Sequence, residues 1–336
     1  MLRIIEDLSN PMERVTRVSS VLTWVDRWGS WKARWGINRM NYVISPGLYA
    51  VGDPDDSCPV LVTANYKMSF DRLRQELKDI NAWILVLDTR GINVWCAAGK
   101  GTFGTAELVR RIAITGLDQI VSHRTIIVPQ LGAPGVAAHQ VRKQSGFKVV
   151  YGPVRAEDLP AFLQAGMKAN RDMRAVRFTF MDRLVLTPIE LVGIIKPVLM
   201  IAALLLILNI TGAVKVALTG LVPYIGAILL GAVITPALLP WIPGRAFAWK
   251  GWLLGMLWAV FLVSKGAGFS GLPAVLNSLS YLLILPAISA FLAMNFTGAS
   301  TYTSLSGVKR EMKVAVPAII GSAASGLLIL LVACVL

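Results

Sequence analysis

The segment around Cys96 is the part of the chain whose residue types could carry out chemistry. It reads Asn-Val-Trp-Cys-Ala-Ala-Gly-Lys over residues 93–100, so one thiol stands among mostly small side chains. Asn93 can cap a short helix, and a thiolate at a helix start ionises more readily and is a soft metal ligand. Small neighbours would let this helix lie against something broad and flat. The residues alone therefore indicate either a thiol beside a cavity for a metal macrocycle or a buried cysteine in a tight turn.

Two more familiar chemistries fit this segment poorly. A phosphate-binding loop needs Gly-x-x-x-x-Gly-Lys-Ser/Thr, but Val94 stands where the first glycine belongs and Gly101 where the hydroxyl belongs. A nucleophilic cysteine needs a base nearby, and the two histidines, His123 and His139, are isolated in sequence and are expected to be structural. The remaining cysteines, Cys58 and Cys334, make no Cys-x-x-Cys spacing, which argues against a disulfide framework or a zinc or iron–sulfur site.

The elements that must position the thiol alternate between strands and helices. Short β-branched and aliphatic runs predict strands at 59–64, 82–88, 125–129 and 147–151, with helices near 69–80, 105–117, 136–145 and 157–167. This alternation predicts a parallel sheet covered on both faces, in which ligands bind at the carboxyl ends of the strands. Four loops would share that edge: residues 65–67, 90–105, 130–135 and 152–155.

Charge is unevenly distributed along the chain. Of 33 Lys and Arg residues only eight follow residue 185, and of 19 acids only Glu190 and Glu311 do. With 55% hydrophobic residues and a mean hydropathy of +0.62, the chain is unlike an ordinary soluble enzyme, a disordered chain or a small disulfide scaffold. A helix needs about 20 apolar residues to cross a bilayer. Apolar stretches of roughly this length predict five transmembrane helices, at 188–210, 214–236, 249–265, 273–295 and 314–336.

Short loops between these helices allow their orientation to be counted. Five basic residues fall on the side of the N-terminal region and only two on the other (Arg245, Lys250, Lys309, Arg310 and Lys313 against Lys215 and Lys265). The positive-inside rule then places the N-terminal domain in the cytoplasm of a multi-pass protein of the cell (inner) membrane. Few charges enter the spans, which favours an anchor over a pump.

Residues 1–40 form a basic, Trp-rich lead, followed by an expected cytoplasmic domain at 41–185 and the membrane domain at 186–336. Trp24, Trp28, Trp31 and Trp35 would share one face of a helix. Such a helix could lie at a membrane interface, where Trp and basic residues are favoured, or could pack on its own domain, with Gly29 and Gly36 breaking it up. The pattern leaves both interpretations open.

The motif at 93–100 resembles the signature of the mercury-methylation corrinoid protein family (HgcA). The stretches 59–67, 130–136 and 147–155 resemble that family too, and they are similar to the corrinoid-binding domain of the corrinoid iron–sulfur protein of the acetyl-CoA pathway. The resemblance covers roughly residues 35–190, and the apolar tail agrees with the mercury family. It implies a Rossmann-like α/β domain that binds a cobalamin-type corrinoid base-off, with the Cys96 thiolate as the lower axial ligand of cobalt.

The same resemblance implies which residues contact the corrinoid. Neither histidine stands in the Asp-x-His-x-x-Gly motif of histidine-ligated corrinoid proteins, which agrees with a cysteine ligand. Cys58 precedes one matched stretch and is interpreted as incidental, although a thiol at the ring edge would be near bound mercury. The expected contact residues are Thr63, Asn93, Val94, Trp95, Cys96, Ala97, Ala98, Gly99, Lys100, Gly101, Thr102, Gln130, Leu131, Gly132, Ala133 and Gly135.

The implied activity is corrinoid-dependent methyl transfer to Hg(II), giving methylmercury. The implied methyl donor is of folate type or its methyltransferase, and the substrate an Hg(II)-thiolate. A thiolate below cobalt would favour transfer of methyl with carbanion or radical character. The chain lacks a four-cysteine iron–sulfur domain, so a ferredoxin-like reductase with a 4Fe-4S cluster is the expected partner.

Two other functions stay open. The first alternative is a membrane-anchored corrinoid methyl carrier of one-carbon, acetyl-CoA-type metabolism. The second is a sensor or transport module that uses the corrinoid domain for binding only. The basic surface fits membrane lipid or an acidic ferredoxin, and no motif points to nucleic acid.

Overall fold

The computed structural model describes residues 15–211, 218–265, 271–302 and 305–336, which form two compact units. An α/β unit extends to Val176, and a helical unit comprises Arg177–Leu336 together with Arg34–Gly36. The division falls before helix α8 (Phe180–Leu184), although the sequence suggested a boundary after residue 185. The reason is packing: α8 lies on α11 (Thr235–Leu238), and the buried side chain of Arg183 donates a hydrogen bond to the carbonyl of Ala237 over 3.1 Å.

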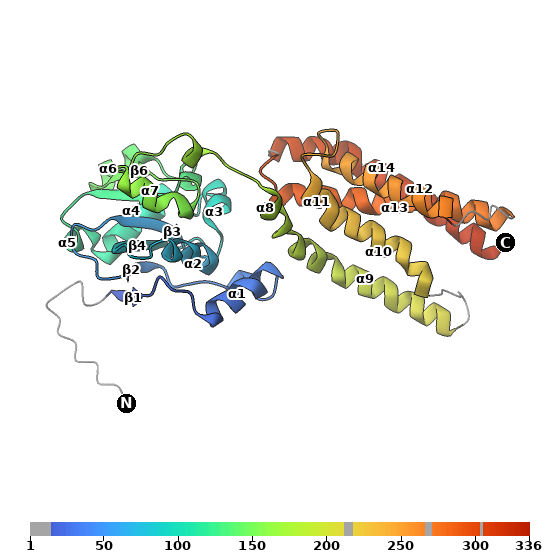
Figure 1. The fold of residues 1–336 in the computed structure, drawn as a ribbon, viewed down its shortest axis with the longest axis horizontal. Coiled ribbons are helices and arrows are strands. Elements are labelled where there is room, and N and C mark those ends of the chain that lie inside the picture. The colour runs from blue at the N-terminus through green and yellow to red at the C-terminus, as the bar shows by residue number, and fades with distance from the viewer. Residues whose placement is uncertain (1–14, 212–217, 266–270, 303–304) are drawn as a thin grey trace, which may run out of the picture. The chain divides into compact units, whose positions relative to one another are not determined.

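The α/β unit is built on a mixed sheet of six strands in the order β1-β2-β4-β3-β5-β6 (Figure 1). The four predicted strands are present and mutually parallel: β3 (Val60–Ala64), β4 (Ala82–Leu87), β5 (Thr125–Val128) and β6 (Lys148–Tyr151). The prediction of a parallel sheet is thus confirmed for these four strands, but the whole sheet is mixed. Two strands that the sequence reading missed extend it, because β2 (Gly47–Val51) pairs antiparallel with β4, and β1 (Thr16–Val18) pairs parallel with β2.

Helices cover both faces of this sheet, as predicted. One hydrophobic core lies between the sheet and α3, α4 and α6, and it contains residues such as Val62, Leu85 and Phe103. The other lies between the sheet and α2 and α7, and it contains Leu61, Phe70 and Phe162. The helices, in chain order, are α2 (Lys67–Gln75), α3 (Val94–Lys100), α4 (Thr105–Thr115), α5 (Leu117–Ile120), α6 (Ala138–Ser145) and α7 (Leu159–Gln164).

Strand order also locates the reversal of chain direction across the sheet. The chain passes from β3 through α2 to β4 on one side, and then crosses back to β5 on the other side of β3. Ligands of such sheets bind at the carboxyl ends of the strands where the order reverses. The carboxyl ends of β3 and β5 are therefore the place where the fold positions a site.

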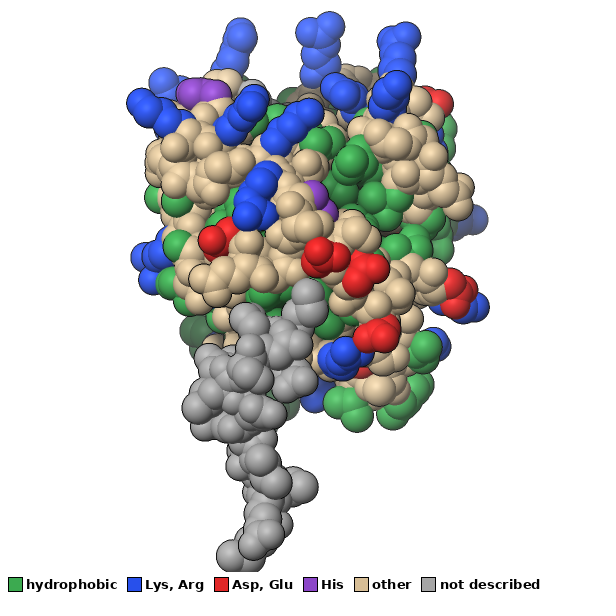
Figure 2. Space-filling view, turned by 90° about the vertical axis from the view of Figure 1, so that its left-hand side faces the viewer, with side chains coloured by type: hydrophobic (Ala, Val, Ile, Leu, Met, Phe, Trp, Pro, Cys, Tyr) green, Lys and Arg blue, Asp and Glu red, His purple; other side chains and the backbone are tan. Residues whose placement is uncertain are grey.

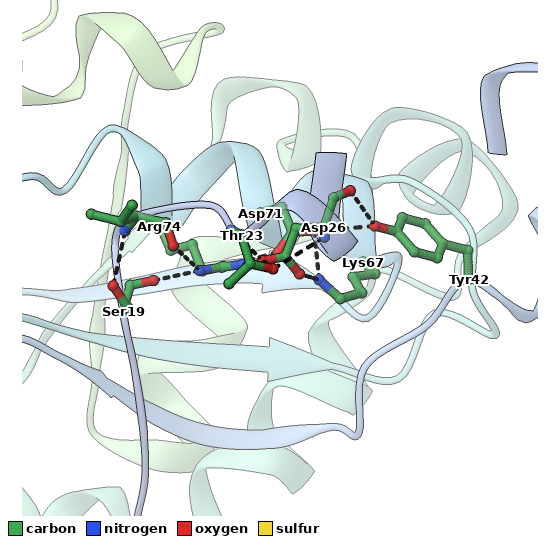
Figure 3. Close-up of polar contacts among 8 residues, drawn as sticks. Ser19, Thr23, Asp26, Tyr42, Lys67, Asp71 and Arg74 are labelled. Atoms are coloured by element: carbon green, nitrogen blue, oxygen red, sulfur yellow. Dashed lines mark hydrogen bonds and ion pairs between the residues drawn. The ribbon is translucent and has the colours of Figure 1, made fainter. Parts of the chain in front are cut away.

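A group of ion pairs fixes the first helix, α1 (Trp24–Arg34), against α2 (Figure 3). The Lys67 ammonium lies 2.6 Å from both Asp26 and Asp71, and the Arg74 guanidinium lies 2.8 Å from Asp26 and 2.9 Å from Asp71. The Tyr42 hydroxyl donates to the backbone carbonyl of Asp26 over 3.1 Å. Burial raises the pKa of Asp26, but hydrogen bonds from Lys67, Thr23 and Arg74 outweigh it and hold this pKa well below its usual range.

We expect Asp26→Asn to release α1 from the α/β unit. The substitution removes a charged acceptor from two cations and should cost about 2 kcal/mol of local stability. Acid should act in the same way. Because the folded-state pKa is depressed, the stabilisation is present above the unfolded value of about 3.9 and is lost as the pH falls below it. Hydrogen exchange of residues 19–34 in the full chain measures both effects.

The matched control for this prediction is Asp53→Asn. Its partner is Arg17 at 2.8 Å, but both side chains are exposed, so less than about 1 kcal/mol should be lost. Equal acceleration of exchange in the two variants would show that the Asp26 pairs do not hold α1.

The helical unit contains four helices that are long and apolar enough to cross a membrane, among the described residues. The expectation of five was not confirmed. The second predicted span begins within residues 212–217, which lie outside the described residues, and its described part is a shorter apolar helix over Val222–Leu238. That segment consists of α10 (Val222–Leu229), a wide π turn (Leu230–Ile234) and α11. The four long segments are Phe180–Leu204, Phe247–Lys265, Leu272–Ala299 and Ser306–Val335.

Three of these segments are built on helices that pack side by side. Helix α13 (Leu272–Asn295) contacts both α12 (Phe247–Lys265) and α14 (Leu305–Val335). Glycine permits the close approach: a Cβ at Gly255 would lie 2.7 Å from the Cα of Pro286 in α13. The remaining long helix, α9 (Thr187–Ile210), contains Pro197.

Candidate functional site

Asn65, which follows β3, stabilises the loop that leads from β4 to α3. Its side-chain oxygen accepts hydrogen bonds from the backbone N–H groups of Thr89 and Gly91, each over 3.0 Å. Glu107 of α4 supports the same loop, since it accepts a hydrogen bond from the N–H of Asp88 over 3.0 Å. Asn65 is buried and was not among the residues expected in the site. A polar residue directly after a buried strand was the signal that could have found it.

Helix α3 follows this loop and carries the thiol. The Asn93 side chain accepts a hydrogen bond from the N–H of Cys96 over 2.9 Å, so Asn93 caps the helix as predicted. Gly101 ends the helix in the left-handed region at φ +80°, a conformation that favours glycine. Ala97 and Ala98 are buried, whereas Cys96 is exposed. The capped helix thus presents its thiol outward.

Small residues hold α3 close to the loop after β5. The helix contacts the short 3₁₀ turn Gln130–Gly132 and the end of β3. Phe103 is fully buried, and Gly132 and Gly135 lie so near it that an added Cβ at either would overlap the Phe103 ring or its carbonyl oxygen. The Cα of Ala98 would also lie 3.2 Å from a Cβ at Gly135. This packing joins the segments at 93–102 and 130–135, which the sequence placed at one edge.

On the exposed side of α3 the space beside the glycines is not filled by atoms of other described residues. Cβ atoms built on Gly99 and Gly101 would meet nothing within 4 Å, and Trp95 is 42% exposed. Cys96 stands between Trp95 and the glycines in sequence. An exposed thiol on a helix with open space over Gly99 and Gly101 has room for the metal of a broad, flat ligand.

The loop 130–135 next to α3 contains a buried polar atom with no hydrogen-bond partner in the described part of the chain. The side-chain oxygen Oε1 of Gln130 is buried and accepts no hydrogen bond from any described residue. Such an orphan costs free energy unless a ligand or water satisfies it. It therefore points to a bound molecule with a hydrogen-bond donor at this edge, which fits the amide-rich rim of a corrinoid.

The residues expected to contact the corrinoid differ in how exposed they are. Trp95, Gly99, Lys100 and Gly101 are exposed, while Val94, Thr102, Leu131, Ala133 and Gly135 are half-buried. Ala97 and Ala98 of α3 are buried by neighbouring protein atoms, and so is Gly132 of the 3₁₀ turn that α3 contacts. Thr63 is buried as well, and strand alternation places its side chain with Leu61, on the face that α2 covers.

The other thiol of the α/β unit lies away from this edge. Cys58 precedes β3 and so stands at the amino end of the strands, with its carbonyl 2.9 Å from His123 Nε2. Burial raises the pKa of the Cys58 thiol, and the hydrogen bond to Asp55 adds to the rise. Cys58 therefore does not lie beside α3, where a thiol at the ring edge would have to be. The described residues contain no group of three or more His, Cys, Asp or Glu side chains that could hold a metal ion.

Comparison with known proteins matches this same region. The sequence model of the family described as "CO dehydrogenase/acetyl-CoA synthase delta subunit" matches residues 39–163, which include β2 to β6 and α3. The chain is 36% identical over 124 residues to the acetyl-CoA decarbonylase/synthase complex subunit gamma of Methanopyrus kandleri, covering 36% of this chain and 26% of that protein. The corresponding subunit of Methanothermobacter thermautotrophicus is 31% identical over 127 residues, covering 37% and 27%.

A third similar protein is the corrinoid/iron-sulfur protein large subunit of Moorella thermoacetica, which is 28% identical over 122 residues, covering 36% of this chain and 27% of that protein. The chain thus spans about a quarter of the length of the curated relatives it matches. What is shared with them is the α/β region that carries the candidate site.

Gln130→Leu should change the stability of the protein and its affinity for a corrinoid in opposite directions. Removing a buried, unsatisfied oxygen should stabilise the ligand-free protein by about 1 kcal/mol, while a lost hydrogen bond should weaken corrinoid binding several-fold. Thermal unfolding without corrinoid and titration with it measure the two effects. Gln140→Leu, at an exposed position of α6, is the control and should change neither. A Gln130→Leu variant with unaltered corrinoid affinity would remove Gln130 from the binding site.

Proposed function

We propose that the α/β unit binds a corrinoid and that the chain serves as a membrane-anchored methyl carrier of one-carbon metabolism. The observation that carries the proposal is the exposed Cys96 thiol on a capped helix, at the carboxyl edge of a sheet whose sequence matches corrinoid-protein relatives. These relatives are named as subunits of acetyl-CoA decarbonylase/synthase complexes and as a corrinoid/iron-sulfur protein, which favours a role in one-carbon metabolism.

Each residue has a task in this proposal. A corrinoid supplies a cobalt centre that can accept a methyl group and pass it on. Cys96 would hold the cobalt through its thiolate, and the Asn93 cap would keep the thiol aimed outward. Gly99 and Gly101 would leave room for the ring, Trp95 would contact it, and Gln130 would accept a hydrogen bond from its rim.

A second candidate acceptor is Hg(II), with methylmercury as the product. The observation that favours it is the segment 93–100, which resembles the mercury-methylation signature and forms one short helix on which Trp95, Cys96 and Gly99 are exposed. A thiolate ligand donates electron density to its metal, which would favour delivery of methyl to an electrophile such as an Hg(II)-thiolate. In this second candidate function the same residues would deliver the methyl group to Hg(II) in place of the acceptor of one-carbon metabolism.

The partners in this proposal follow from charge and from the cysteine count. The chain has three cysteines, too few for a four-cysteine cluster of its own beside Cys96, so a ferredoxin-like 4Fe-4S protein would supply electrons. Figure 2 shows Lys and Arg side chains gathered along the top of one face, at the level where Figure 1 shows α6. This basic surface would suit an acidic ferredoxin. A folate-type methyl donor, or the methyltransferase that carries it, would bind at the site edge.

The helical unit acts as an anchor in this proposal. It contains a cavity of about 830 Å³ between α12, α13 and α14, lined largely by apolar side chains. Its charged lining residues, Arg245, Arg310 and Glu311, lie just before α12 or in the first turns of α14. Charges near helix ends are typical of a membrane boundary and do not mark a path across it, which disfavours the transport alternative.

Purified full-length protein loaded with a methylated corrinoid tests the proposal. A bound corrinoid should give a visible absorption band, and the methyl group should move to an acceptor once a reductant is present. Supplying an Hg(II)-thiolate in one arm and the other subunits of an acetyl-CoA decarbonylase/synthase complex in the other separates the two functions. Transfer in only one arm decides the acceptor, and a colourless protein after reconstitution would contradict both.

A further inference from the structure

Helix α1 carries its aromatic face outward. Trp24 is 76% exposed, Val25 78% and Trp28 46%, although such side chains normally pack against the domain that bears them. Trp28 and Trp31 stack on each other, with ring centroids 4.9 Å apart and an angle of 11° between the planes. The helix therefore packs on its own unit, but through the face opposite the exposed tryptophans, which leaves these side chains available for a membrane.

The inward face of α1 explains why the helix keeps this orientation. Asp26 points toward α2 and pairs with Lys67 and Arg74, as Figure 3 shows. Gly29 lies against the Tyr42 ring, where a Cβ would come within 2.7 Å of it, and Ala33 is buried. Turning the tryptophans inward would break the ion pairs and push a large side chain into the place of Gly29. The fold therefore holds the apolar face outward.

The charge beside this face is positive. Residues 15–43 contain one acid, Asp26, and five basic residues. Asp26 is occupied by its ion pairs on the inner side. Arg27 is exposed on α1 next to the tryptophans, and Lys32 is half-buried one turn further on. Tryptophan rings flanked by cations are favoured at the boundary of a bilayer, where the rings enter the headgroup region and the cations meet anionic lipids.

We propose that α1 is a membrane-docking helix that inserts Trp24, Val25 and Trp28 into the headgroup region of an anionic bilayer. The bilayer in this contact would be the one that the chain itself crosses, because four of the described helices are long and apolar enough to cross a membrane. Tethering raises the effective concentration of lipid around α1, so that a weak surface affinity is sufficient. Docking would place the α/β unit on the membrane surface in one orientation. This inference does not depend on the identity of the bound cofactor or acceptor.

A fluorescent label on α1 tests the proposal in the full chain. Val25→Cys, in a background with Cys58, Cys96 and Cys334 changed to Ser, carries an environment-sensitive fluorophore. The protein is placed in nanodiscs that hold one copy each and contain lipids bearing a nitroxide quencher near the headgroup. Phosphatidylcholine discs are compared with discs in which a third of the lipid is phosphatidylglycerol. We expect a blue-shifted emission and quenching that is several-fold stronger in the anionic discs.

Matched positions on the same unit provide the controls. Ile114→Cys, labelled in the same way on α4, is 60% exposed and should be quenched weakly in both lipids. Trp24→Ser/Trp28→Ser should abolish quenching at position 25. Each basic residue near an anionic surface strengthens attachment roughly fivefold, so Arg27→Glu should reduce quenching at least that much, whereas Lys78→Glu, exposed in the turn after α2, should not. Equal quenching at positions 25 and 114, or equal quenching at position 25 in the two lipids, would overturn the proposal.

Discussion

Replacing Cys96 by alanine will give a folded protein that no longer transfers methyl groups. The Cys96 side chain is exposed, and the backbone N–H of residue 96 keeps its hydrogen bond to the Asn93 side chain in the variant. Alanine is also a better helix former than cysteine, so α3 should persist. If Cys96 holds the metal as proposed, its loss should reduce the methyl transfer rate by about 100-fold, since losing even a residue that only supports a metal ligand costs about 10–100-fold. The visible spectrum of the bound corrinoid should change as well, because the axial ligand sets the electronic state of the metal.

Cys58→Ala is the matched control for this prediction. It removes a thiol from the same unit but at the amino end of β3, away from α3. We expect its methyl transfer rate and its spectrum to equal those of the unaltered protein. If Cys96→Ala retained the full rate of transfer, the thiol would not be the metal ligand, and the site would have to be sought elsewhere on the carboxyl edge.

A pair of glycine substitutions will have opposite effects on folding. At Gly135 an alanine Cβ would overlap the carbonyl oxygen of Phe103 and press on Ala98, both of them backbone or near-backbone obstacles. Overpacking of this kind costs about 1–3 kcal/mol, and it should move α3 away from the 130–135 loop. We expect Gly135→Ala to lower the unfolding temperature and to weaken corrinoid binding together.

Gly99→Ala should instead separate these two properties. Gly99 lies inside α3 with open space before its Cβ position, so alanine should stabilise the helix by up to about 1 kcal/mol. The added methyl group occupies the surface on which a corrinoid would lie, so affinity should fall while the unfolding temperature rises. Unfolding curves and corrinoid titrations of both variants test this. Unchanged corrinoid affinity in Gly99→Ala would mean that the exposed side of α3 does not face the ligand.

Local patterns in the sequence determined much of the α/β unit. The apolar runs of β3, β4, β5 and β6 specify buried strands because burial on both faces needs uninterrupted hydrophobic residues. Asn93 specified the start of α3 because its side chain can satisfy a free N–H at a helix start. The long apolar stretches likewise predicted helices that could cross a membrane. In each case the signal lies within one short segment.

Pairings between distant segments were decided only by the tertiary structure. The antiparallel partnership of β2 with β4, the support of the 88–91 loop by Asn65, and the contact of Phe103 with Gly132 and Gly135 all join residues far apart in sequence. The same is true of the Asp26 pairs that turn the tryptophans of α1 outward.

A periodic pattern shows that a helix has an apolar face, but the direction of that face depends on what the opposite face binds. The sequence by itself therefore determined where a thiol-bearing site could stand. Packing and ion pairing between its elements decided what surrounds the thiol and which surface of the unit faces outward.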